Sequence, residues 1–66
     1  MKVVLFVNCD GPAFADSSDA VELSNILYRL SVRVRQFESL DQIDEPITIR
    51  DSNREPVGRM TVTDDE

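Results

Sequence analysis

The sequence predicts a small α+β domain of βαββ order, in which a three-stranded antiparallel sheet carries one amphipathic helix on one face. Three observations lead to this expectation. A β-branched, apolar run opens the chain, apolar residues recur at helical spacing in its middle, and two short alternating runs close it. The 66 residues are expected to form one domain, over 1–66, that buries only roughly 60% of its unfolded surface. Any further apolar surface is therefore a candidate contact.

The first expected element is a strand from Lys2 to Asn8, which stops at the turn signal Gly11-Pro12. Side chains alternate along a strand, so Val4 and Phe6 point away from the face that their neighbours use. Both faces of this strand are apolar. Either nearby side chains cover the second face in part, or Val4 and Phe6 form the contact face of a homodimer or of a partner complex.

The middle of the chain, from Asp19 to Phe37, has the apolar spacing of one amphipathic α-helix. The apolar stripe recurs at alternating steps of three and four and is widened by Ile26; its members are Ala20, Leu23, Leu27, Leu30, Val34 and Phe37. A helix with one such stripe needs a single apolar partner surface, and the sheet is expected to provide it.

Acidic residues precede and open this helix. Asp16 or Asp19 could cap it, and Asp19 with Glu22 has the spacing of a capping box in which Asp replaces Ser or Thr. Acids here also complement the positive end of the helix dipole. Phe14, just upstream, is expected to fold back onto the helix.

An acidic linker, 39–46, leads to two alternating strands at 47–50 and 57–63. The loop between them, 51–56, makes a hairpin in which Asn53 is expected to take the left-handed conformation. Met60 and Val62 are expected to point inward, and residues 64–66 to form a frayed tail. The predicted sheet has the third strand in the middle, so that all neighbours are antiparallel. The alternative places the first strand beside the second, in parallel.

The expected hairpin register gathers acids at its open end. If Arg50 lies opposite Val57, the antiparallel register brings Glu45 opposite Val62. The rim then holds Asp41, Asp44, Glu45, Asp64, Asp65 and Glu66. Like charges this close are either a solvated rim that keeps the protein soluble or a surface kept for binding.

The composition argues against several functions. Thirteen acidic and seven basic residues give a net charge of −6, which disfavours direct binding to nucleic acid phosphates. The chain has no histidine and one cysteine, Cys9, so we expect no internal disulfide, no metal site and no cofactor. Nucleophilic catalysis lacks a base, and we expect no enzyme. The apolar N-terminal run is too short for a signal peptide or a membrane span, which favours a cytoplasmic protein.

Two stretches together carry a resemblance. The first, F-A-D-x(5)-E-L-x-x-I-L-x-x-L, is formed by Phe14, Asp16, Glu22, Leu23, Ile26, Leu27 and Leu30. The second, D-S-N-R-E-P-V-G, covers residues 51–58. The chain resembles a group of small phage- and prophage-encoded proteins in which an acidic-capped helix precedes a hairpin of the form D-x-N-G-x-x-V-G. Arg54 stands where that pattern has Gly, which indicates a wider loop than a tight mirror-image turn.

In size, charge and lack of catalytic groups, the chain is similar in type to anti-CRISPR proteins that mimic nucleic acid. The likeness implies that carboxylates meet Lys and Arg on the DNA-binding surface of a host defence complex and block target DNA. The partner-binding residues would be Asp41, Asp44, Glu45, Asp64 and Asp65 at the rim, with Asp16, Asp19 and Glu22 as a second patch. The alternative is a homodimeric structural or regulatory phage accessory protein that pairs through Val4 and Phe6.

Overall fold

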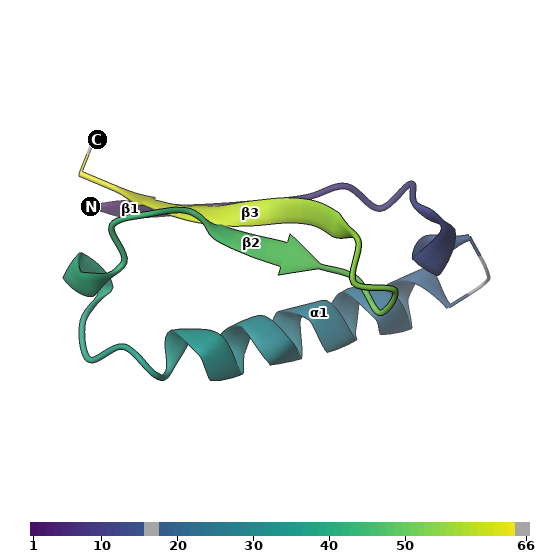
Figure 1. Cartoon of the computed structure of the whole chain (residues 1–66), viewed down its shortest axis with the longest axis horizontal. Coiled ribbons are helices and arrows are strands. Elements are labelled where there is room, and N and C mark those ends of the chain that lie inside the picture. The colour runs from purple at the N-terminus through teal and green to yellow at the C-terminus, as the bar shows by residue number, and fades with distance from the viewer. Residues whose placement is uncertain (16–17, 65–66) are drawn as a thin grey trace.

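The computed structural model describes residues 1–15 and 18–64. Its elements, in order, are β1 (Lys2–Val7), the 3₁₀ turn η1 (Pro12–Phe14), α1 (Asp19–Val34), the 3₁₀ turn η2 (Leu40–Gln42), β2 (Ile47–Arg50) and β3 (Pro56–Thr63) (Figure 1). The predicted order of strand, helix, strand and strand is confirmed. Of the expected tail, residues 65–66 lie outside the described residues.

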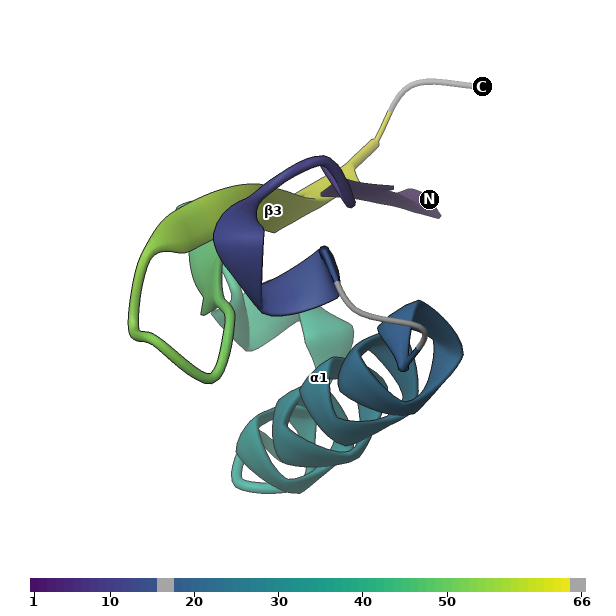
Figure 2. The same cartoon turned by 90° about the vertical axis from the view of Figure 1, so that its right-hand side faces the viewer.

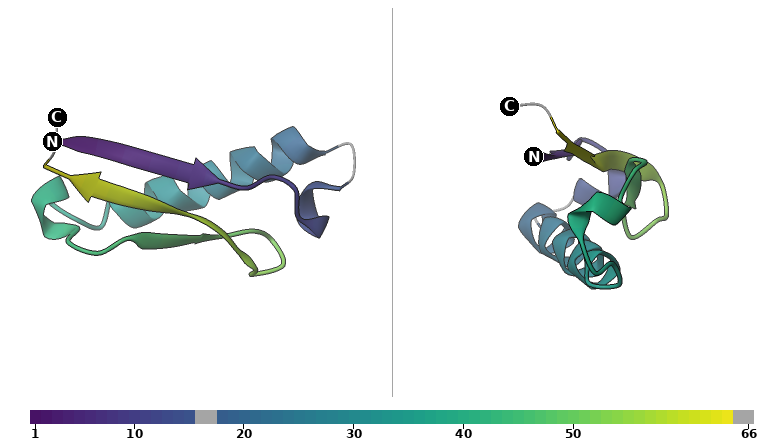
Figure 3. Two further views of the ribbon diagram at one scale, coloured as in Figure 1. Left: turned by 90° about the horizontal axis from the view of Figure 1, so that it is seen from above. Right: turned by 90° about the vertical axis from the view of Figure 1, so that its left-hand side faces the viewer.

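The sheet has the strand order β1-β3-β2, and both pairs of neighbours are antiparallel. The prediction that the third strand lies in the middle is therefore confirmed. The helix α1 covers one face of the sheet (Figure 1). It is inclined to the strands, beginning on the β1 side of the sheet and ending beneath β2 and β3 (Figures 2 and 3).

The hairpin keeps the predicted register over most of its length. Ile47 lies opposite Met60, as expected, but the register shifts between Ile49 and Arg50, so that Arg50 faces Pro56 rather than Val57. Proline has no N–H to donate, and a shift at this position lets the wider loop close without a ladder bond from it. The expected pairing of Arg50 with Val57 is wrong, while the pairs nearer the open end are unaffected.

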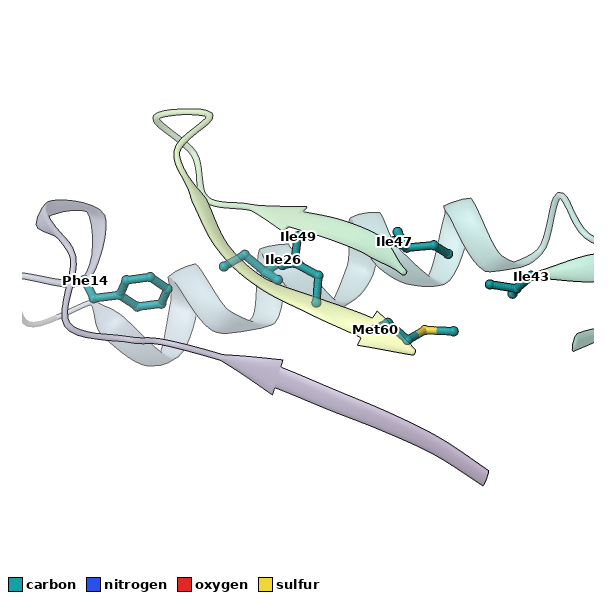
Figure 4. Close-up of a cluster of buried hydrophobic side chains, with 6 residues drawn as sticks. All are labelled: Phe14, Ile26, Ile43, Ile47, Ile49 and Met60. Carbon is teal, nitrogen blue, oxygen red and sulfur yellow. The ribbon is translucent and has the colours of Figure 1, made fainter. Parts of the chain in front are cut away.

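The core lies between α1 and the hairpin and consists of Phe14, Ile26, Ile43, Ile47, Ile49 and Met60 (Figure 4). Ile26, which was expected only to widen the apolar stripe, is 2% exposed, whereas Leu27, an expected member of the stripe, is 42% exposed. The helix is therefore rotated toward the hairpin relative to the expectation. The burial of Phe14 against α1 confirms that it folds back onto the helix.

The helix starts without the predicted capping box. Ser18 occupies the N-cap position with no side-chain hydrogen bond, and Asp19 is already the first helical residue. The backbone N–H of Glu22 donates to the Ser18 carbonyl at 2.9 Å, but the Glu22 side chain turns to the hairpin instead of back to the cap. Asp16, the other expected cap, lies outside the described residues.

The left-handed position of the hairpin loop is Arg54, with φ of 66°, and not Asn53 as expected. Asn53 donates its N–H to the Asp51 carboxylate at 2.9 Å, so the chain reverses one residue later. A five-residue loop, 51–55, results, which agrees with the expected wider turn.

Replacing Arg54 by glycine is expected to stabilise the protein by about 0.5–1 kcal/mol. The left-handed conformation costs an L-residue about 1–2 kcal/mol, and glycine removes this cost. Glycine also raises the conformational entropy of the unfolded chain, which offsets part of the gain in stability. Urea unfolding followed by circular dichroism measures the difference. A free energy of unfolding that stays the same or falls would show that the loop does not strain Arg54.

Candidate functional site

The acidic residues assigned to partner binding fall into three groups. Four of them are exposed and belong to the segment before β2 or follow β3; we call them the acidic end, and they are Asp41, Asp44, Glu45 and Asp64. Asp65 and Asp16 lie outside the described residues. Asp19 and Glu22 belong to the first turn of α1, away from the acidic end.

Local structure holds the acidic end in place. The Ser39 hydroxyl accepts a hydrogen bond from the Asp41 N–H at 3.2 Å and caps η2. The buried side chain of Ile43 then anchors the chain in the core directly before Asp44. The turn η2 and the C-terminal end of β3 lie at the same end of the molecule (Figures 1 and 3). The four described residues therefore belong to segments at the open end of the hairpin, while the predicted close grouping of their carboxylates stays a prediction.

The acidic end has little charge compensation. Within the described ranges, none of its four carboxylates is within ion-pairing distance of a basic group. Lys2 lies opposite Thr63, the residue before Asp64, and brings one positive charge to this end of the sheet. Exposed carboxylates without partners keep their hydration, so they are free to meet a basic surface.

Glu22 does not form part of an exposed acidic patch. Its side chain is buried, and the Glu22 Oε2 atom accepts a hydrogen bond from the Ser52 N–H at 2.7 Å. The carboxylate thus ties the first turn of α1 to the hairpin loop. Of the expected second patch, only Asp19 is both described and exposed.

Asp51 organises the same loop, a role that the sequence analysis missed. The buried Asp51 carboxylate accepts hydrogen bonds through Oδ1 from the N–H groups of Asn53 and Glu55, both at 2.9 Å. The Arg54 N–H donates to the Asp51 carbonyl at 2.9 Å. The signal for this turn was present, since an Asp side chain at the start of a loop commonly accepts a hydrogen bond from the backbone N–H two residues on.

Arginines line the side of α1 that faces β2. Arg29 and Arg33 of α1 and Arg50 of β2 border a groove of about 240 Å³ whose walls are otherwise mostly apolar. Arg29 Nη2 donates to the Arg50 carbonyl at 3.2 Å, and Arg50 Nη1 donates to the Arg54 carbonyl at 3.1 Å. Positive charge therefore follows the β2 flank.

The strand β1 exposes apolar side chains on both faces. Val4 and Phe6, the candidate dimer face, lie on the outer face opposite Thr61 and Arg59. Val3, Val4, Leu5 and Phe6 are each between 44% and 56% exposed. The helix-facing side of β1 stays open because α1 packs on the hairpin. The two alternatives for the outer face, partial cover by nearby side chains and contact with a second copy or a partner, both stay predictions.

Other kinds of site are not indicated in the part of the chain that the structure describes. No three His, Cys, Asp or Glu side chains of residues 1–15 and 18–64 come together as metal ligands. No helix there is long and apolar enough to cross a membrane. Comparisons with protein-family models, with curated proteins and with solved structures find no match for this chain.

Proposed function

We propose that this protein is a phage-type inhibitor of the anti-CRISPR kind, which uses its acidic end to occupy the basic surface of a DNA-binding host complex. The observation that carries the proposal is the gathering of Asp41, Asp44, Glu45 and Asp64 at one end, exposed and without ion pairs in the described residues. The protein acts by binding in the host cytoplasm, without a cofactor and without catalysis.

The mechanism is electrostatic competition with DNA. Carboxylates at the acidic end contact Lys and Arg side chains that otherwise neutralise DNA phosphates, so that the inhibitor and target DNA exclude each other. The Ile43 anchor and the Ser39 cap hold the end in one conformation, which limits the entropy lost on binding. The arginines along the β2 flank are repelled by the same basic surface, and this polarity orients the acidic end toward the partner.

Reversing two charges of the acidic end is expected to abolish partner binding. Asp44→Lys combined with Glu45→Lys replaces attraction by repulsion, and we expect an affinity loss of about 100-fold or more. The matched control, Asp10→Lys with Glu55→Lys, makes the same change in net charge at exposed residues outside the acidic end and should stay within about threefold of the wild-type affinity.

The partner for this measurement is a CRISPR interference complex that the tagged protein captures from a host lysate. Binding should weaken as the salt concentration rises, and duplex DNA should displace the protein. Circular dichroism of both variants checks that they are folded. If the acidic-end variant binds as tightly as the control, or if DNA does not compete, the proposal is wrong.

A second candidate is a homodimeric structural or regulatory phage accessory protein. The exposure of Val4 and Phe6 on the outer face of the sheet favours it. Under this hypothesis, Phe6→Ser gives a monomer by light scattering. A wild-type protein that remains a monomer at high concentration would exclude it.

A further inference from the structure

The backbone of β1 presents a row of unpaired hydrogen-bonding groups at the edge of the sheet. The Asn8 N–H donates to the Val57 carbonyl at 2.7 Å, which sets the phase of the β1–β3 ladder. In an antiparallel ladder the residues that bond to one neighbour alternate with residues that point the other way. Lys2, Val4 and Phe6 therefore bond toward β3, while Val3, Leu5 and Val7 direct their N–H and C=O groups to the free edge.

The free edge of β1 lacks the features that protect sheet edges. Natural edges are blunted by charged side chains, prolines or bulges, and they are often short. The edge strand β2 has only four residues, ends at a register shift and is flanked by Arg29 and Arg50. In contrast, β1 pairs regularly along its whole length, and every residue of the strand after Lys2 is apolar. Of the two edges, β1 is the one built to accept another strand.

The accessible surface area of the chain indicates how much surface a partner could cover. The chain exposes 5011 Å², whereas a compact monomer of 7.5 kDa exposes about 4,200 Å². The excess of roughly 800 Å² is close to what one partner contributes to a standard protein–protein interface. The radius of gyration, 12.7 Å, also exceeds the value of about 11 Å for a compact chain of this length.

We propose that a second copy of this chain covers the edge, and that two β1 strands pair antiparallel to give one continuous six-stranded sheet. A two-fold axis at Leu5 puts Leu5 opposite Leu5 of the second copy and Val3 opposite Val7 of the second copy. Each of these pairs exchanges two hydrogen bonds, because all of their free groups point outward.

Charge favours a second copy as the occupant. Residues 1–9 contain no acid, although the chain as a whole has a net charge of −6, so edge pairing brings no carboxylates of the two strands together. The same register places Met1 opposite Cys9 of the second copy.

The helix contributes to the same interface. A two-fold axis perpendicular to the sheet leaves both helices on one face, and α1 begins on the β1 side (Figure 2). Leu27 lies two positions from Arg29 on the helix, hence on the flank opposite the β2 groove. Its exposed side chain and the open inner face of Val3 and Leu5 face the second copy together. The pairing of two β1 strands rests on the second candidate function, a homodimer, and specifies how its two copies meet. It does not depend on the acidic end.

The first test is the mass of the protein in solution. Sedimentation equilibrium between about 1 µM and 1 mM should show a species of twice the 7.5 kDa chain mass. In the dimer, the amides of Val3, Leu5 and Val7 should be protected from hydrogen exchange like those of β3. A monomer throughout this range, or fast exchange at these three amides in a dimer, would overturn edge pairing.

The second test removes one outward N–H and keeps every side chain. Chemical synthesis with a ligation at Cys9 gives a chain that is N-methylated at Leu5, which should be folded by circular dichroism but monomeric. The control, N-methylated at Val4, loses a donor to β3 and should be less stable instead. A dimer that survives methylation of Leu5 but not Phe6→Ser would contradict edge pairing and favour contact through the outer face. Neither result bears on the acidic-end variants.

Discussion

Replacing Gly58 by alanine is expected to remove a large share of the protein's free energy of unfolding. Gly58 lies in β3 opposite both Val7 of β1 and Ile49 of β2. A Cβ atom there would lie 1.9 Å from the Phe6 carbonyl oxygen and 2.8 Å from its carbonyl carbon. These are backbone atoms of the neighbouring strand, so no side-chain rotation relieves the clash, and β1 must move away from β3.

The expected loss is at least about 3 kcal/mol, because the substitution both overpacks the sheet and disrupts the ladder next to it. A chain of this length has a total stability of about 3–10 kcal/mol, of which this is a large share. Urea unfolding measures the loss, and hydrogen exchange should show β1 amides that are no longer protected.

Gly11→Ala is the matched control for this prediction. A Cβ atom at Gly11 meets no other atom within 4 Å, and its φ of −75° suits alanine. We expect a change within about 0.5 kcal/mol of the wild type. If the two alanine variants proved equally stable, the close approach of β1 to Gly58 would not exist in solution.

The fold class could be predicted from periodicity, but the rotation of the helix could not. Alternating and helical spacings distinguish strands from a helix wherever one face is buried. These spacings show which residues of α1 belong to the apolar stripe. They do not show which of these residues are buried, since this depends on the surface against which the helix packs. The hairpin lies on the side of Ile26, and Leu27 stays exposed as a result.

The parts of the site that sequence reasoning missed depend on contacts between distant segments. Glu22 matches a capping-box spacing, yet its carboxylate binds Ser52, 30 residues along the chain. A local motif and a tertiary partner competed for one side chain, and only the structure shows which prevailed. The acidic end was predictable because a hairpin register converts sequence positions into neighbours. The free groups of β1 were not, because the phase of a ladder is not encoded in side-chain alternation.

Replacing Asp51 by alanine is expected to destabilise the protein by about 2–4 kcal/mol. The Asp51 Oδ1 atom accepts two backbone N–H groups of the hairpin loop, and hydrogen bonds to a charged acceptor contribute about 1.5–3 kcal/mol each. Water can hydrate part of the freed N–H groups, which limits the loss. The conservative variant Asp51→Asn keeps an acceptor for both donors without its charge and should lose about half as much.

The stability of a double variant separates a loop that folds as one unit from two independent contacts. Asp51 holds the loop from within and Glu22 holds it from the helix, through the Ser52 N–H. Once either carboxylate is removed, the hairpin loop is less ordered, so the remaining carboxylate contributes less to the stability of the loop. Asp51→Ala combined with Glu22→Ala should therefore lose less than the sum of the single losses, by about 0.5–1 kcal/mol in urea unfolding. Strict additivity would instead mean that the helix and the hairpin loop are stabilised separately, and that the Glu22 contact does not depend on the shape of the loop.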